Sequence, residues 1–526
     1  MVSNLGALIQ SVGASWMMIS LGQPADMVAL VQASVTLPTM LLSLLSGAVA
    51  DSLDRRKIML AAQSFMLIAS VALSICAWTG VLTPVLLLSF TFLIGCGSAF
   101  NGPAWQASVG DMVPRADLPG AVALNGMGFN LARSVGPAIG GAIVAAAGAA
   151  AAFTVNAASY IALITVLSRW HPPRPEQLLP RERIIDAIGA GVRYVSMSPA
   201  IRIVLARSAL YCIGSSAVMA LMPLMAKVLI GGGPVTYGLL LGAFGVGAVA
   251  GGLATARLRR VWSTESIVRI SSIGLALAAA VSGVSTYLVV TMLALLVAGA
   301  GWVLALSTFN VSVQMLAPRW VVARALSLYQ MAAFGALAGG SWLWGVVAAS
   351  LGVKEALLIA SPVMVVGVLL GRWTRMAQAE DLNLDPLRQW QAPETAVPVE
   401  SRSGPVVINV EYRISESDVS EFLGAMEARR RIRRRDGARR WKLLRDLADP
   451  EIWIERYETP TWIDYIRHNS RLTQHDAQIP GRLRALHRGD EPPRVRRTIE
   501  VQTDASSAAQ PLTLQINEAL SDSSAS

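Results

Sequence analysis

Twelve long apolar runs constrain the fold of this chain more than any other feature of its sequence. Each run is long enough, at 1.5 Å per helical residue, to cross a hydrocarbon core of ~30 Å. Only 15% of the 526 residues are charged, compared with ~25% in soluble domains. We therefore expect an all-α polytopic membrane protein. Its transmembrane helices are predicted in two sets of six, at about 2–21, 27–50, 58–79, 82–105, 120–147 and 150–169, and at about 200–230, 235–256, 266–284, 286–310, 323–349 and 356–374.

The cations between these runs gather in alternate loops, and Lys354 is the clearest exception. Cytoplasmic loops of membrane proteins carry an excess of Lys and Arg. Both termini are therefore predicted to be cytoplasmic. The same topology accounts for the net charge of +10, so we expect contact with membrane lipid and no nucleic-acid partner. The cation-rich loops contain residues 55–57, 115, 169–193, 257–260 and 319–324.

Other bulk features exclude several kinds of site. Cys76, Cys96 and Cys212 lie inside apolar runs without paired spacing, so we expect no disulfide, no metal site and no cofactor. No basic segment precedes the first run, and a cleavable signal peptide is not expected. A first span without a cytoplasmic lead-in indicates either that the natural start lies upstream or that a minimal N-terminus is tolerated.

The runs and the composition between them predict six segments. A polar segment separates the two sets of spans, and its stretch Arg183–Val195 has the spacing of an amphipathic helix, either on the membrane surface or in a soluble linker. The predicted segments are an N-terminal six-helix bundle at 1–169, an inter-half loop at 170–199, a C-terminal six-helix bundle at 200–375, a linker at 376–404, a cytoplasmic α+β domain at 405–502 and a disordered tail at 503–526.

The α+β domain is predicted from alternating strand and helix signals. The order strand, helix, strand, strand, helix, strand is typical of a ferredoxin-like fold. Asp464 and His468 are four residues apart on its second helix, where pairing at the surface is expected more than catalysis. The expected elements are strands at 406–414, 440–447, 451–457 and 495–501, and helices at 417–434 and 461–473.

The two sets of spans repeat each other in sequence at one offset. Gly47 pairs with Gly251 at a separation of 204 residues, and the same offset pairs Gly136 with Gly340 and Gly141 with Gly345. It also relates the Arg-Arg pairs at 55–56 and 259–260, Pro-Arg at 114–115 and 318–319, and the residue pairs 124/328 and 127/331. Such a repeat indicates two parallel halves with a substrate site between them near the membrane midplane.

The loop between the second and third runs is a candidate latch. Gly47 allows two helix ends to approach closely, and Asp51 can accept hydrogen bonds from helix N-terminal amides. Arg55 and Arg56 can pair with carboxylates or lipid phosphates. The alternative is a cationic loop that only sets topology.

The fifth run holds the densest cluster of helix-bending residues. Gly136, Pro137, Gly140 and Gly141 let this helix bend and pack closely against a neighbour. Arg133 is the one cation well inside a run, and a charge there is a candidate for contact with a substrate or coupling ion, or a partner for neighbouring carbonyls.

No Asp, Glu or His lies near the middle of a run. Proton coupling would therefore use an edge carboxylate, for which Asp26 and Asp111 are the candidates, or a residue upstream of this sequence. Asn130, Asn101 and Gln10 are candidate cavity residues, with interhelical hydrogen bonding as the alternative. Further polar or aromatic candidates are Asn4, Gln32, Gln106, Asn156, Asn310, Trp16, Trp105, Phe129 and Trp302.

Two of these motifs carry a family resemblance. The pattern G-x-x-x-D-x-x-x-R-R at 47–56 resembles the signature loop of the major facilitator superfamily, although Asp54 stands where the family has glycine. The string G-P-x-x-G-G at 136–141 resembles the motif of members that export by exchange, and the second half departs from it at Ser341 and Trp344. The phrases at 103–107 and 129–141 are similar to bacterial drug and siderophore exporters.

The resemblance implies proton-coupled efflux of small amphipathic molecules across the bacterial inner membrane by alternating access. It implies a transporter and not an enzyme. A hypothesis of a different class is a sensor or enzyme anchored by the helical body, with its activity in the α+β domain. The sequence predicts neither the substrate nor the oligomeric state.

Overall fold

The computed structural model describes residues 2–112, 118–170, 184–318, 320–376, 384 and 393–500. The chain divides into two compact units. The first unit comprises Met1–Ile188, Pro199–Met315 and Ala323–Gln378, and the second comprises Gly189–Ser198, Leu316–Val322 and Ala379–Ser526.

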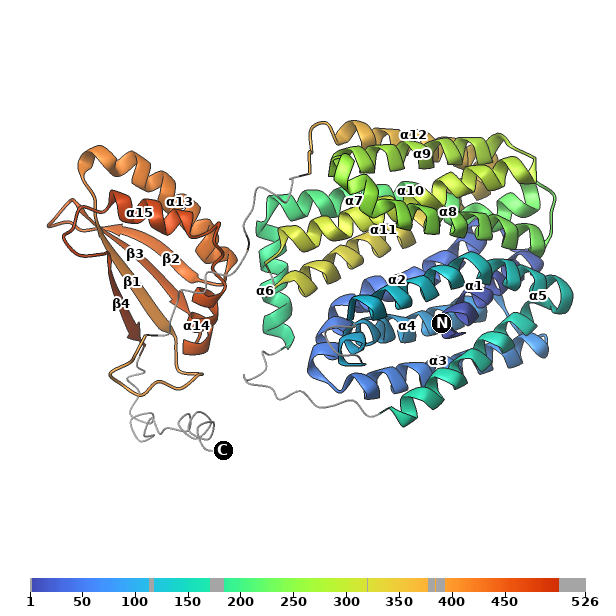
Figure 1. Cartoon of the computed structure of the whole chain (residues 1–526), viewed down its shortest axis with the longest axis horizontal. Helices are drawn as coiled ribbons and strands as arrows, with labels where there is room; N and C mark the ends of the chain where they lie inside the picture. The colour runs from blue at the N-terminus through green and yellow to red at the C-terminus, as the bar shows by residue number, and fades with distance from the viewer. Residues whose placement is uncertain are drawn as a thin grey trace. The chain divides into compact units, whose positions relative to one another are not determined.

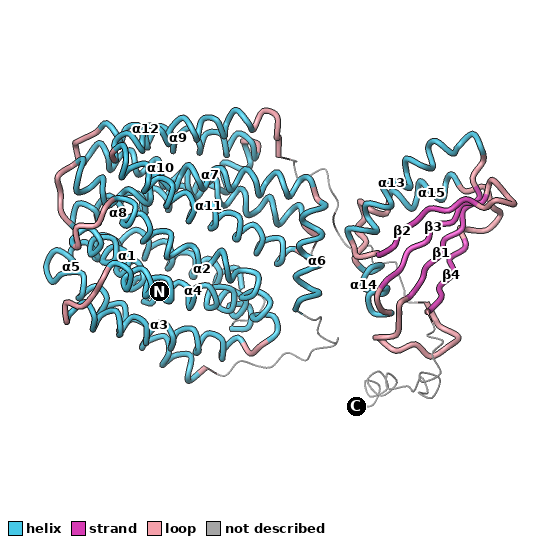
Figure 2. The backbone as a smooth tube through the Cα atoms, turned by 180° about the vertical axis from the view of Figure 1, so that it is seen from behind, coloured by secondary structure: helices cyan, strands magenta, loops and turns pink. Residues whose placement is uncertain are grey.

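Long apolar helices lying side by side make up the first unit (Figures 1 and 2). Helices α1 to α5 form what we call the first half, and α7 to α12 the second half. Their bounds are α1 Val2–Ser20, α2 Ala25–Ser52, α3 Arg55–Trp78, α4 Pro84–Met112 and α5 Leu118–Arg169, then α7 Pro199–Leu224 with the π-helical turn Met225–Leu229, α8 Pro234–Val261, α9 Thr264–Val284, α10 Leu288–Leu316, α11 Val322–Leu351 and α12 Val353–Leu370. The inter-half helix is α6, Ile184–Met197.

Within the described residues, ten helical stretches are long and apolar enough to cross a membrane. The polytopic helical fold is therefore confirmed, whereas the number of twelve spans stays a prediction. Helix α1 is not among the ten, and the stretch Val135–Arg169 counts once. It covers part of the predicted run 120–147 and all of the run 150–169, which are the two arms of α5. The arms meet at Gly148, whose φ of 79° favours a residue without a Cβ.

Helices α4 and α10 continue beyond the runs predicted from hydropathy. The predicted ends are residues 105 and 310, whereas the helices end at Met112 and Leu316. In each case a proline follows two residues later, at Pro114 and Pro318. The residue before a proline disfavours the helical conformation. Proline position, rather than loss of apolar character, therefore explains where these helices end.

The second unit is built around a four-stranded antiparallel sheet in the order β2-β3-β1-β4. Its strands are β1 Val406–Arg413, β2 Arg439–Arg445, β3 Ile452–Thr459 and β4 Arg494–Ile499, and its helices are α13 Val419–Arg435, α14 Trp462–Ser470 and α15 Gln478–Leu486. The strands and helices predicted from sequence are present. Helix α15 was not predicted, because Pro480 and Gly481 argue against a helix. Its Leu483 and Leu486 are nevertheless buried in the core.

The three helices of the second unit pack on one face of this sheet. Strand β1 alternates strictly, so that Val406, Ile408, Val410 and Tyr412 are buried while the residues between them are half-buried. The buried side chains form one core with residues of α13, α14 and α15, including Phe422, Met426, Tyr465, Leu483 and Leu486. We call the sheet surface opposite these helices the open face.

The buried carboxylate of Glu455 accepts hydrogen bonds from neighbouring side chains in this core. The Oε2 atom of Glu455 accepts from Arg429 Nε at 2.7 Å, and its Oε1 accepts from Arg433 Nε at 3.4 Å and from Trp441 Nε1 at 3.0 Å. Burial opposes the negative charge of Glu455, but the two guanidinium groups outweigh burial and hold its pKa at about 2.

His468 lies next to this cluster rather than at the surface. Its Nε2 is 2.8 Å from Arg433 Nη1, and the side chain is buried. Burial and the charge of Arg433 lower the pKa of His468 well below its ordinary 6.5. Asp464 instead accepts from the Thr461 hydroxyl and pairs with Arg467. The expected surface pairing of Asp464 with His468 is therefore wrong, because the imidazole points into the core and the carboxylate stays at the N-terminus of α14.

We expect Glu455→Gln to destabilise the second unit by about 3–5 kcal/mol, because two buried guanidinium groups lose their counter-charge. Hydrogen exchange of the β3 amides, measured by mass spectrometry on the full chain, would report the loss. Glu458→Gln is the matched control, since its partner Arg440 is 74% exposed, and a change under about 1 kcal/mol is expected. Equal effects of the two substitutions would contradict the role given to Glu455.

The second unit should also lose stability on acidification. The unfolded chain protonates His468 near pH 6.5, whereas the folded chain does so only at a much lower pH. The stabilisation is therefore complete above pH 6.5 and falls by about 2 kcal/mol at pH 5. The same exchange measurement at pH 7 and pH 5 would show it. His468→Gln should abolish that loss, while His475→Gln should retain it.

Candidate functional site

The two halves of the first unit meet backbone to backbone at glycines of α5 and α8. A Cβ placed on Gly141 would lie 2.7 Å from the Pro234 carbonyl oxygen and 3.0 Å from Gly238 Cα. A Cβ on Gly238 would lie 2.7 Å from the carbonyl oxygen of Pro137. These distances leave no room for a side chain. The close packing predicted for Pro137 and Gly141 is therefore present, and its partner is the opposite half.

The other two glycines of this motif face α1. A Cβ on Gly140 would lie 3.0 Å from Ile9 Cα, and one on Gly136 would lie 3.1 Å from Leu8 Cβ. A single stretch of α5 thus packs against a helix of its own half on one side and a helix of the other half on the second side.

The second half repeats this arrangement at the offset found in the sequence. A Cβ on Gly345 would lie 2.8 Å from Asp26 Cα and 2.6 Å from the Ala29 side chain, both on α2. A Cβ on Gly340 would lie 3.0 Å from Ile213 Cα on α7. Helix α11 therefore packs on α2 and α7 as α5 packs on α8 and α1.

Contact between α2 and α11 continues to the other end of both helices. Ser43 donates from Oγ to the Ser327 carbonyl at 3.3 Å. A Cβ on Gly47 would lie 3.3 Å from Ser327 Oγ. Gly47, predicted as part of a latch, therefore lies at a junction between the two halves.

The rest of the candidate latch joins α3 to the end of α5. Asp54, the departure from the family pattern, is the N-cap of α3 and accepts from the Arg56 and Lys57 amides at 3.0 and 3.4 Å. Arg56 donates to the last carbonyls of α5, from Nε to Leu167 at 2.9 Å and from Nη2 to Ser168 at 2.6 Å. Arg56 therefore caps a helix C-terminus. Arg55 also has a partner, and the Asp51 side chain lies outside the described residues.

A cavity of about 390 Å³ lies among α7, α10 and α11. Its lining combines aromatic rings with neutral polar groups, and the Asn310 amide oxygen accepts from Gln314 at 2.6 Å. Arg259, the second-half counterpart of Arg55, donates to Ser307 at 3.4 Å. The lining residues are Cys212, Trp302, Leu306, Ser307, Asn310, Val311, Tyr329, Gln330, Ala333, Phe334 and Leu337.

Only part of this lining was predictable from the sequence. Trp302 and Asn310 were candidates, but Tyr329, Gln330 and Phe334 were missed. The repeat held the missing signal, because residues 329–334 correspond to 125–130 at the offset of 204. That stretch contains Phe129 and Asn130, which were named.

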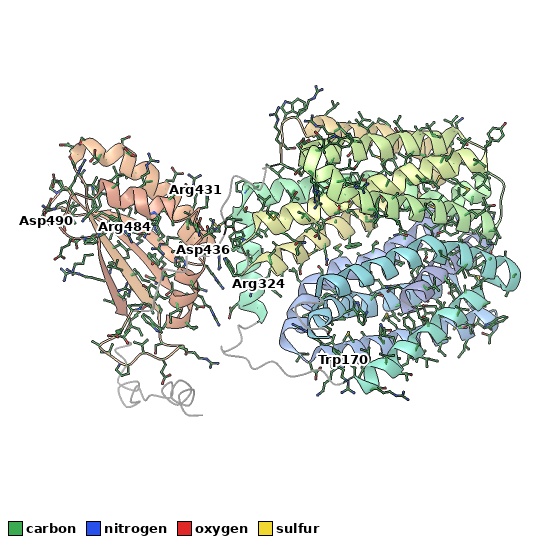
Figure 3. The ribbon with its side chains drawn as sticks, in the orientation of Figure 1. Trp170, Arg324, Arg431, Asp436, Arg484 and Asp490 are labelled. Atoms are coloured by element: carbon green, nitrogen blue, oxygen red, sulfur yellow. The ribbon has the colours of Figure 1, made fainter. Side chains whose placement is uncertain are left out.

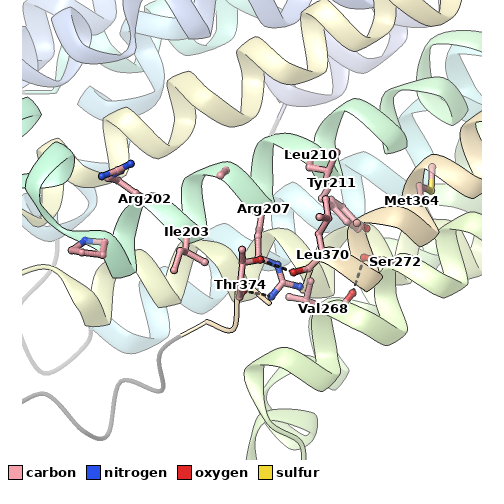
Figure 4. A pocket seen from close by; sticks show the side chains of 13 residues that line it. Arg202, Ile203, Arg207, Leu210, Tyr211, Val268, Ser272, Met364, Leu370 and Thr374 are labelled. Carbon is pink, nitrogen blue, oxygen red and sulfur yellow. Dashed lines mark hydrogen bonds between the residues drawn. The ribbon is translucent and has the colours of Figure 1, made fainter. Parts of the chain in front are cut away.

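A second cavity, of about 460 Å³, lies among α7, α9 and α12 (Figure 4). Arg207 lies eight residues after Pro199, a position from which a long side chain could extend to the membrane surface. Its side chain instead lines the cavity and is only 8% exposed. It forms an ion pair with Glu265 and donates to the Thr374 carbonyl at 3.3 Å. Glu265 also pairs with Arg269. Arg207 on α7 therefore joins α9 and the residues that follow α12.

Gln10, Asn101 and Asp26 are not among the residues that line the smaller cavity. Gln10 is buried in a network that joins α1, α3 and α5, in which Ser70 donates to Gln10 and Asn156 donates to Ser70 and to Tyr160. Asn101 and Asp26 each have a buried side-chain oxygen without a hydrogen-bond partner among the described residues. The side chains of Asp111, Asn130 and Arg133 lie outside the part of the chain that is described.

Comparison with known proteins identifies the family to which the chain belongs. The family model described as transmembrane secretion effector matches residues 1–505. The multidrug efflux pump Tap of Mycolicibacterium fortuitum is 25% identical over 385 residues, which cover 70% of this chain and 92% of Tap. The enterobactin exporter EntS of Escherichia coli is 27% identical, over 62% of this chain and 78% of EntS.

The staphyloferrin A transporter of Staphylococcus aureus is 26% identical over 189 residues, 35% of this chain. The aligned segment spans 48%, about half, of that relative. Among solved structures, the nucleoside transporter NupG superposes with a TM-score of 0.53 at 15% identity, covering 72% of this chain and 98% of NupG. A bacterial homolog of the lysosomal transporter Spinster gives 0.58 at 13%, over 72% and 96%. These likenesses show the fold, and the chain belongs to the transmembrane secretion effector family of major facilitator transporters.

Proposed function

We propose that this transporter exports small amphipathic molecules from the cytoplasm by alternating access, driven by protons. The observation that carries the proposal is the paired glycine contact, α5 on α8 and α11 on α2, which joins two halves repeating at 204 residues. Contacts made by backbone atoms and one small side chain, Ala29, allow one half to rock against the other without unpacking large side chains. The fold in this proposal has twelve spans, both termini in the cytoplasm and an inner-membrane location.

The substrate class follows from the smaller cavity. None of its lining residues carries a formal charge, and Trp302, Tyr329 and Phe334 provide apolar surface beside the amides of Asn310 and Gln330. Ligand sites of this size are mostly apolar with a few polar groups that fix orientation. The relatives named as a multidrug pump and as siderophore transporters support substrates of this kind.

We assign proton coupling first to Asp26. One of its carboxylate oxygens is buried without a partner among the described residues, at the point where α2 packs on Gly345. An ionisable group held in such a place is a functional candidate. Asp111 and Arg133 stay candidates from the sequence, with Asn130, Asn101 and Gln10 as further polar residues of the pathway.

In this mechanism the latch works at the cytoplasmic end. Gly47 contacts Ser327 across the halves, and Arg56 ties α3 to the end of α5. Asp51 and Arg55 complete the latch, and the stretch Gly136, Pro137, Gly140 and Gly141 is the bend about which α5 moves. The second unit is then an accessory cytoplasmic domain of ferredoxin-like fold, which its strand order supports.

Efflux-deficient cells expressing the protein should accumulate less of a fluorescent amphipathic dye or siderophore than cells with an empty vector, and an uncoupler should abolish the difference. Asp26→Asn and Arg133→Ala should lose most of the export. Glu355→Gln is the matched control, a carboxylate at the first turn of α12. Equal accumulation with and without the protein, across a panel of drugs and siderophores and despite membrane expression, would overturn the proposal.

Gly141→Leu should block export while leaving the protein in the membrane, because the added side chain would overlap the Pro234 carbonyl and Gly238. Gly339→Leu is the matched control: a Cβ at Gly339 meets nothing within 4 Å, and export should match the wild type. Dye efflux normalised to membrane expression measures both. Wild-type export by Gly141→Leu would show that the α5–α8 contact has no part in the cycle.

A further inference from the structure

We propose that the open face of the sheet in the second unit docks on anionic lipid headgroups of the membrane surface. The inference rests on the register of the four strands. It concerns a surface that the transport mechanism does not use.

One row of cross-strand partners, running across all four strands, contains three cations and no acid. Lys442 on β2 is the partner of Arg456 on β3, Arg456 is the partner of Asn409 on β1, and Asn409 is the partner of Arg496 on β4. Cross-strand partners point to the same face of a sheet. Arg456 lies between the buried residues Glu455 and Tyr457, so the row points away from the helices, onto the open face.

These three cations are exposed, and no ion pair is recorded for them among the described residues. Most other basic residues of the open face lie beside an acid: Arg413 pairs with Asp449 at 2.8 Å, Arg440 pairs with Glu458 at 3.4 Å, and Arg494 lies opposite Glu411. Arg439 also lies opposite Glu458, so two arginines share that acid. The row of Lys442, Arg456 and Arg496 is the part of this face with three cations and no acid.

Such a row opposes folding. Like charges directly opposite each other in a sheet destabilise it, and Arg456 and Arg496 are only two strand spacings, about 10 Å, apart. Among the described residues, no ion pair with Lys442, Arg456 or Arg496 offsets this repulsion. An anionic surface that contacts all three side chains at once would offset the repulsion between them.

Two observations favour lipid headgroups over nucleic acid. Proteins that bind single strands stack bases on aromatic rings, but the aromatic residues of the sheet, Tyr412, Trp441, Trp453 and Tyr457, all belong to its helix-covered core. The unit is also tethered: 35 residues separate Leu370 at the end of α12 from Val406. A chain of that length spans at most about 120 Å even when fully extended, so the unit stays within reach of the bilayer.

The test uses the full chain in lipid nanodiscs. A fluorophore is placed at Thr498→Cys, on the open face, after Cys76, Cys96 and Cys212 have been replaced by Ala. Energy transfer to a headgroup-labelled lipid then reports docking. Nanodiscs of phosphatidylcholine alone are compared with nanodiscs containing phosphatidylglycerol, each at low salt and at 1 M salt, where the Debye length is about 3 Å.

We expect docking only with phosphatidylglycerol at low salt. Each cation near an anionic surface contributes about a fivefold factor. The variant Lys442→Gln/Arg456→Gln/Arg496→Gln should therefore lower the docked-to-free ratio about 100-fold. The matched control is Arg431→Gln/Arg434→Gln/Arg484→Gln, three exposed arginines of α13 and α15 on the other side of the unit, two of which Figure 3 labels. The control should dock like the wild type.

Three results would overturn the proposal. Energy transfer that is the same in both lipids would show that headgroup charge is not recognised. An equal loss in both triple variants would assign the effect to overall charge. Finally, a fluorescent single-stranded oligonucleotide that binds the full chain through Lys442, Arg456 and Arg496, while lipid composition has no effect, would assign the face to nucleic acid.

Discussion

The first unit depends on the direct approach of helix backbones at its glycines. In lipid, helices gain little from burying apolar side chains, because the lipid tails are equally apolar, and close van der Waals packing must hold them. Gly141 against Gly238, and Gly345 against Asp26 and Ala29, give this packing where the two halves meet. Gly141 and Gly345 are related by the 204-residue offset of the sequence, and each packs against a helix of the opposite half.

Much of this arrangement was predictable from sequence because periodicity and repeats are local or one-dimensional signals. Apolar runs located the helices, the glycine cluster predicted close packing at Gly136 and Gly141, and the repeat paired these two residues with Gly340 and Gly345. The partner Gly238 was not predictable, because nothing in a single sequence says which helix faces which. The cavity shows the same limit: Asn310 stood out as a polar residue in an apolar run, whereas Tyr329 and Phe334 did not.

The second unit shows a different limit. Its strands and first two helices follow from alternation and charge, but α15 forms despite Pro480 and Gly481 because Leu483 and Leu486 complete the core. Tertiary packing outweighs local propensity there. Likewise, a spacing of four suggested a pair between Asp464 and His468, although burial against Arg433 determines where the imidazole lies. Sequence spacing indicates which residues share a helix face, and not which face is covered.

The buried ion pair of Arg207 and Glu265 also determines where the membrane body ends. The guanidinium donates to the Thr374 carbonyl, and a Cβ on Gly371 would lie 2.6 Å from Arg207 and 2.7 Å from Glu265. Gly371–Thr374 thus belong to the packed helices, in agreement with the predicted run at 356–374. The connector is therefore free to vary in length and composition only after Thr374. In a chain truncated before Thr374, the buried guanidinium of Arg207 would lack one of its hydrogen-bond acceptors.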